Sequence, residues 1–146
     1  MVKEIIRKEP DKKYRGQPCS VTCVGTAYDH IHTWPFMIVK PEGIRYDGYL
    51  SLKYMNQFTR EFLPVAKRVD FKKSERPQLK DFLSANDARC CICVLGHYLY
   101  ADTQTYWSFF DNDNDEVIAV WYLRVPSAEN TTRKASQKHW DSDRKD

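Results

Sequence analysis

The sequence lacks the features of a secreted or membrane protein. No apolar run approaches the roughly 20 residues that a bilayer-spanning helix needs. The N-terminal segment MVKEIIRKEPDKK has a basic start but no apolar stretch of the kind found in a signal peptide. The net charge is only +3, too small to indicate a nucleic-acid-binding protein, and no internal repeat is visible. We therefore expect a cytoplasmic protein that does not bind membranes and for which nucleic-acid binding is disfavoured.

The cysteines do not form a disulfide framework. There are five, an odd number, and three of them fall within positions 90–93. In a reducing compartment they are free thiols. A zinc site made of Cys90, Cys91, Cys93 and His97 is disfavoured, because Cys-x-Cys without a second pair is not a zinc-ligand spacing. The acidic run from Asp111 lacks the glycine and glutamate of a calcium loop. We predict no metal and no cofactor.

The composition suits one domain with its own core. Hydrophobic residues make up 42% of the 146 residues, which is enough for the chain to fold around a core without disulfide bonds. Residues 1–16 are charged and read as a loosely packed arm. Residues 126–146 are polar and are expected to be a disordered tail. The domain itself is predicted to span residues 17–125.

Apolar spacing predicts helices first and strands afterwards. Cys19, Cys23, Ala27 and Ile31 recur at helical spacing, so a helix is expected from about Pro18 to His30. Two more helices are expected, one starting after Ser51 and ending before Pro64, and a short one starting near Pro77. The predicted strands are a short one at 36–39 and longer ones at 90–101, 106–110 and 117–125. Residues 65–76 are basic and read as a loop. Segregation of helices from antiparallel strands is the α+β pattern.

The residues that could carry chemistry are a cysteine and a histidine. Cys19 falls in the first turn of the first predicted helix, where the helix dipole and free N–H groups favour a thiolate and can hold an oxyanion. His97 is a base candidate on a predicted strand. A base needs an orienting partner, and Asp111 or Asn112 at the end of the next strand can supply one.

This order of motifs resembles the papain-like cysteine peptidase superfamily, most closely its small phage and bacterial members. The resemblance covers roughly residues 17–125. It rests on Cys19-Ser20-Val21-Thr22-Cys23, on Ile92-Cys93-Val94-Leu95-Gly96-His97 and on the strand ending in Asp111. It implies a papain-like fold and a Cys19–His97–Asp111 triad, with Asn112 as the alternative orienting residue. It further implies a peptidase, isopeptidase or amidase that acts through a thioester.

The sequence departs from that superfamily in one respect. Members commonly carry a glutamine six residues before the cysteine, which lends an N–H to the oxyanion hole. Gln17 is two residues before Cys19 but six before Cys23. Gln17 is therefore an oxyanion candidate, and Cys23 is the alternative nucleophile. Cys19 is preferred, because Cys23 would lie one turn inside the helix.

Other functions fit the same sequence. A phage or mobile-element protein could use this fold without catalysis to bind a host protein in the host cytoplasm. Nucleic-acid contact through the basic residues of 65–76 is a weaker third option, which strong salt dependence would reveal. For the enzyme, the partner is a protein or peptide substrate.

Overall fold

The computed structural model describes residues 4–39, 41, 43 and 49–126 and confirms the α+β class. The predicted tail lies outside the described residues, except for Pro126. The helices are α1 (Cys19–Ile31), α2 (Leu52–Phe62) and α3 (Leu79–Ser84). The strands are β1 (Ile6–Lys8), β2 (Val65–Asp70), β3 (Ala88–Val94), β4 (His97–Asp102), β5 (Thr105–Trp107) and β6 (Val117–Pro126). All six strands form one sheet in the order β1-β5-β4-β3-β6-β2.

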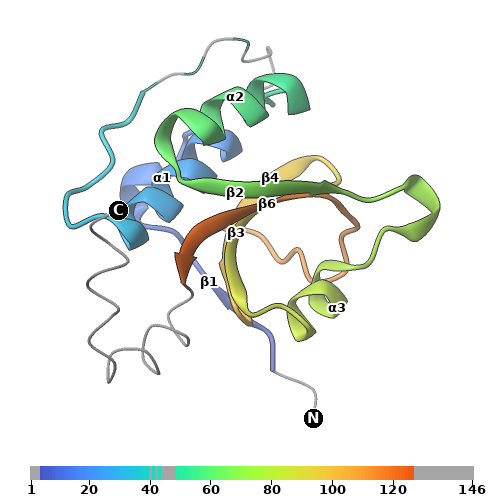
Figure 1. Ribbon diagram of the computed structural model, residues 1–146. Coiled ribbons are helices and arrows are strands. Elements are labelled where there is room, and N and C mark those ends of the chain that lie inside the picture. Colours follow the sequence, from blue (N-terminus) through green and yellow to red (C-terminus); the bar gives the residue numbers. More distant parts are fainter. Residues whose placement is uncertain (1–3, 40, 42, 44–48, 127–146) are drawn as a thin grey trace, which may run out of the picture.

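Helices cover both faces of this sheet (Figure 1). The side chains of β3 alternate between the faces, as the twofold period of a strand requires. Cys91 and Cys93 pack into the core shared with α1 and α2, whereas Cys90 and Ile92 pack into the core shared with α3. Because both faces are buried, β3 and β6 read as continuous apolar runs in the sequence.

The first predicted helix is confirmed with a shift of one residue. Pro18 occupies the N-cap position and Cys19 is the first helical residue. The second and third predicted helices are also present. Ser51 is the N-cap residue of α2, although its side chain makes no capping hydrogen bond.

The prediction of one long strand over 90–101 is wrong. The chain forms a hairpin, with β3 and β4 paired antiparallel and turning at Leu95 and Gly96. Gly96 has a φ of 81°, a left-handed conformation that favours glycine. His97 is therefore the first residue of a strand and lies next to a turn, rather than in the middle of a strand.

Three further segments differ from expectation. Part of the predicted loop 65–76 is the edge strand β2, whereas the expected strand at 36–39 is absent. The expected strand over 106–110 ends at Trp107. The predicted loose arm contributes β1, which pairs in parallel with β5, and it places Tyr14 fully inside the core.

Tyr14 fixes the segment that leads into α1. Its hydroxyl donates to Asp29 at 2.7 Å, and its ring lies against Gly25 on the helix. A Cβ at Gly25 would lie 2.4 Å from the Tyr14 hydroxyl oxygen, so only glycine allows this contact. Tyr14 thereby ties the segment before α1 to the middle and the C-terminal turn of this helix.

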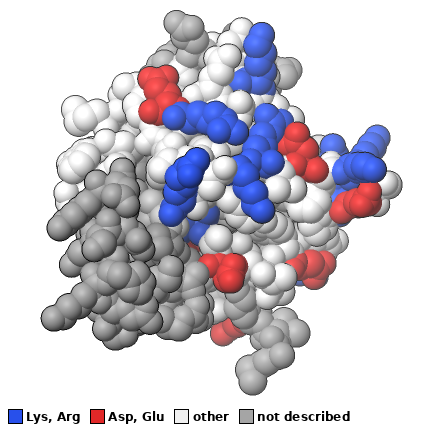
Figure 2. All heavy atoms as spheres, in the orientation of Figure 1, with Lys and Arg blue, Asp and Glu red and all other residues white. Residues whose placement is uncertain are grey.

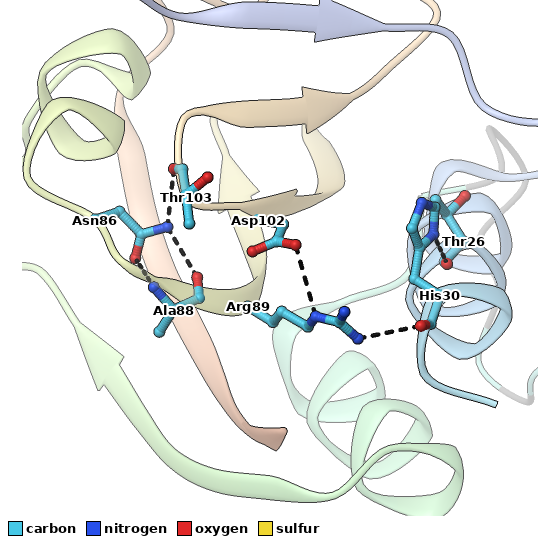
Figure 3. A network of polar contacts seen from close by, with 7 residues as sticks. All are labelled: Thr26, His30, Asn86, Ala88, Arg89, Asp102 and Thr103. Atoms are coloured by element: carbon cyan, nitrogen blue, oxygen red, sulfur yellow. Dashed lines mark hydrogen bonds and ion pairs between the residues drawn. The ribbon is translucent and has the colours of Figure 1, made fainter. Parts of the chain in front are cut away.

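A polar network fixes the C-terminal end of α1 to the sheet (Figure 3). Arg89 of β3 donates to the carbonyl of His30 at 3.1 Å and pairs with Asp102 of β4 at 3.6 Å. The Asn86 amide bridges the carbonyls of Ala88 and Thr103 at 2.9 and 3.1 Å. These bonds connect the helix, β3 and β4 into one unit, so the orientation of α1 over the sheet is set.

Two basic side chains of the edge strand β2 lie over aromatic rings of the neighbouring strand β6. The Lys67 ammonium and the Arg68 guanidinium each lie 5.3 Å from the centre of an aromatic ring of β6, Tyr122 and Trp121 respectively. On the face shown in Figure 2, basic and acidic side chains are interspersed. Lysine and arginine on an edge strand also disfavour pairing with another chain.

Candidate active site

A cleft of about 610 Å³ opens where the first turn of α1 meets the β3–β4 turn and the end of β5. The described residues that line it are Gln17, Pro18, Cys19, Thr22, Tyr49, Gly96, His97, Tyr98, Trp107, Ser108, Phe109 and Phe110. The two residues singled out for chemistry, Cys19 and His97, therefore line the same cavity although they are 78 positions apart in the sequence.

The two candidate cysteine nucleophiles have different surroundings. Cys19 is partly exposed and lies at the N-terminus of α1. Cys23 is only 1% exposed, lies in the core, and is not among the residues of the cleft. Burial raises the pKa of the Cys23 thiol well above its ordinary value, and a hydrogen bond with Cys91 raises it further. A protonated, inaccessible thiol is a poor nucleophile, so the geometry favours Cys19.

Backbone N–H groups surround the position of Cys19. Thr22 is the first residue of α1 whose N–H bonds a carbonyl four residues earlier, that of Pro18, at 3.1 Å. The N–H groups before it have no helical acceptor and carry the positive end of the helix dipole. Gln17 is exposed and also lines the cleft, so its side-chain amide can reach a ligand there. These donors suit an oxyanion.

Burial favours the neutral form of His97. Burial lowers the pKa of its ring below the ordinary value, and the negative charge of Asp115 opposes this only partly. The Phe110 ring meets the imidazole edge-on with the two ring centres 5.9 Å apart. A neutral imidazole has one nitrogen that can accept a proton, and the hydrogen bonds of the ring decide which one.

A chain of hydrogen bonds decides the tautomer of His97. The Asn112 amide donates to the Asp115 carboxylate at 2.7 Å, so its oxygen Oδ1 faces Ser108. The Ser108 hydroxyl therefore gives its single proton to that oxygen, at 2.6 Å. Ser108 Oγ also accepts from the backbone N–H of Phe110 at 3.1 Å and lies 3.2 Å from Nε2 of His97. Since its proton is already used, Oγ can only accept from Nε2.

The neutral His97 ring consequently carries its proton on Nε2 and a lone pair on Nδ1. Within the described part of the chain, Ser108 is the one hydrogen-bond partner of this ring. Nδ1 is thus the nitrogen that remains to act as a base. We name the sequence Asp115–Asn112–Ser108–His97 the orienting chain.

The two predicted orienting residues are placed differently. Asn112 is buried and acts on His97 through Ser108 rather than directly. Asp111 is exposed, accepts from the N–H of Asp113 at 3.0 Å and lies 3.5 Å from the Tyr106 hydroxyl. No hydrogen bond joins Asp111 to His97 among the described residues. The structure therefore brings Asn112, and not Asp111, into the network of the histidine.

Sequence reasoning missed Ser108 and Asp115. Ser108 stood inside a predicted strand, and Asp115 stood in a predicted polar turn. The chain leaves β5 after Trp107 and bends, so the Ser108 side chain points to His97. The Tyr106 hydroxyl fixes this bend by accepting the Asn112 N–H at 3.0 Å and donating to Asp113 at 2.6 Å. Only the run of hydrogen-bonding residues from 111 to 115 hinted at such a turn.

Over the described ranges, no group of three or more His, Cys, Asp or Glu side chains is arranged to hold a metal ion. Among those same residues, no helix has the length and apolar character that crossing a bilayer requires. Comparisons of the chain with protein-family models, with curated proteins and with solved structures gave no match.

Proposed function

We propose that the protein is a cysteine hydrolase on a papain-like fold, with Cys19 as nucleophile and His97 as its base. The observation that carries this proposal is the shared cleft, which is lined both by a thiol at a helix N-terminus and by a histidine whose Nδ1 can act as a base. A helix that bears the cysteine and packs on a largely antiparallel sheet that bears the histidine supports the proposed fold.

The mechanism follows from the geometry. His97 takes the thiol proton of Cys19 on Nδ1, and the resulting imidazolium is stabilised by Ser108, which accepts from Nε2. Cys19 Sγ attacks the carbonyl carbon of an amide, and the first N–H groups of α1 bind the oxyanion. The C–N bond breaks and the amine leaves with the proton from His97. Water then hydrolyses the thioester to a carboxylic acid and restores the thiol.

Acyl transfer can be tested directly with p-nitrophenyl acetate. Attack by Cys19 forms an Sγ–C bond and releases p-nitrophenolate, which is followed by its absorbance. We expect a burst of p-nitrophenolate and an acetyl group on the peptide that contains Cys19. Cys19→Ser and His97→Ala should lose the burst, whereas Cys23→Ser should keep it. Acetylation no faster than that of a free thiol, or unaffected by His97→Ala, would refute the proposal.

A further inference from the structure

The described walls of the cleft are largely aromatic. Five of the twelve described lining residues are Tyr49, Tyr98, Trp107, Phe109 and Phe110. None of the described lining residues is Lys, Arg, Asp or Glu, and burial favours the neutral form of His97. A charged group that entered this cleft would lose water without gaining a counter-ion among these described residues, which is costly.

The rim of the cleft next to His97 is apolar as well. The Phe110 side chain is 65% exposed although its ring contacts His97. Leu95, directly before the lining residue Gly96, is 64% exposed. Large exposed apolar side chains beside a concave site are typical of ligand-binding surfaces. Phe110 is therefore available to pack on a bound group.

Basic side chains that contact lining residues are already engaged. Arg7 donates to the Ser108 carbonyl at 3.0 Å. The Arg15 guanidinium lies over the ring of the lining residue Phe109, 5.2 Å from its centre. It is also paired with Glu9 at 3.1 Å, so its charge is balanced within the protein. Arg15 therefore does not turn the cleft into a carboxylate site.

We propose that this cleft binds an uncharged aromatic or large apolar side chain of the substrate, and that Phe110 is a specificity-determining residue. The inference rests on the proposed function and names its substrate class: an amide whose acyl group carries such a side chain. Cys19 forms the Sγ–C bond with that acyl carbon, the amine leaves with a proton from His97, and water releases the free acid.

Binding can be tested apart from catalysis with the full-length Cys19→Ser protein. The ligands are the N-acetyl amides of phenylalanine, aspartate and lysine, and binding is followed through the Trp107 indole N–H signal in NMR titrations. We expect the phenylalanine amide to bind about tenfold more tightly than either charged amide, since it gains apolar burial without desolvating a charge. Phe110→Ala should weaken its binding by about two- to tenfold, the range of an aromatic pair.

Met37→Ala is the matched control, because Met37 is 78% exposed and does not line the cleft. It should leave the affinity unchanged. Equal affinity for the three amides, or no effect of Phe110→Ala on binding, would overturn the proposed substrate class. If Cys19 were still acetylated by p-nitrophenyl acetate, the hydrolase proposal would stand. Failure of that acetylation would overturn both.

Discussion

Ser108→Ala tests the orienting chain at its centre. Ser108 is 2% exposed and contacts the His97 ring, the Asn112 amide and the Phe110 N–H. Alanine keeps the backbone and most of the volume but removes all three hydrogen bonds. The proton of the neutral His97 ring is then no longer held on Nε2, and the imidazolium that forms during catalysis loses Ser108 Oγ as its hydrogen-bond acceptor.

Two magnitudes follow from these contacts. Asn112 is 5% exposed, so its Oδ1 would be left buried without a donor, and we expect a loss of about 1–3 kcal/mol in the free energy of unfolding. A hydrogen bond to a charged group contributes about 1.5–3 kcal/mol, and 1.36 kcal/mol is a factor of ten. The thiolate–imidazolium pair, and with it the alkylation rate of Cys19, should therefore fall by about tenfold to a hundredfold.

Urea unfolding measures the stability of this variant, and timed iodoacetamide labelling with peptide mapping measures the rate at Cys19. Ser84→Ala is the control, because the Ser84 hydroxyl bonds only the Lys80 carbonyl within α3, on the opposite face of the sheet. It should leave the alkylation rate unchanged. A folded Ser108→Ala protein whose Cys19 reacts as fast as in the wild type would show that the orienting chain has no role.

Three other changes test the fold and its electrostatics. Gly25→Ala should cost about 1–3 kcal/mol in urea unfolding, because its Cβ would overlap the buried Tyr14 ring; unchanged stability would contradict this packing. Arg89→Ala should cost about 3–5 kcal/mol because it removes one partner of a buried ion pair with Asp102, whereas Arg15→Ala, in an exposed pair, should cost about 0–1 kcal/mol. Equal losses would contradict the difference in burial. Burial lowers the pKa of His97, so below about pH 6.5 the unfolded state binds more protons than the folded state, and the stability contributed by this group falls as the pH falls. His97→Gln should therefore flatten the dependence of the unfolding free energy on pH between about 5 and 7. An unchanged slope would refute this.

The helices and the core were predictable because local spacing determines them. Cys19, Cys23 and Ala27 recur on one face of α1, and a proline marks its start. The apolar strand β6 was likewise predictable, because both of its faces are buried. These elements placed the cysteine at a helix N-terminus.

The missed elements depend on contacts that are distant in the sequence or on single residues. β1 has only three residues, and it forms by pairing with the edge of β5. β2 is an edge strand whose exposed side chains are mostly polar, so it has no apolar run in the sequence. One glycine at position 96 divides the expected long strand into a hairpin. A two-residue turn of this kind inside an apolar run has no periodic signal.

The two reactive residues of the site were predictable from the sequence, but the residues that orient His97 through hydrogen bonds were not. Cys19 and His97 could be singled out because thiols at helix N-termini and imidazoles are common catalytic groups, and Cys19 fell at a predicted helix start. Ser108 and Asp115 function through a bend whose direction is set by the Tyr106 hydroxyl. Such a bend depends on the folded sheet. Sequence spacing alone predicted Asp111 or Asn112, and not Ser108, as the direct partner of His97.

The most direct test of the central claim is the pH dependence of iodoacetamide alkylation at each of the five cysteines, in the wild type and in His97→Ala. We predict that Cys19 reacts fastest and already well below pH 8, about where a free thiol begins to ionise, and that His97→Ala abolishes this early reaction. If Cys19 reacts no faster than a free cysteine, or reacts equally fast without His97, the pairing of the two residues and the proposed hydrolase are wrong.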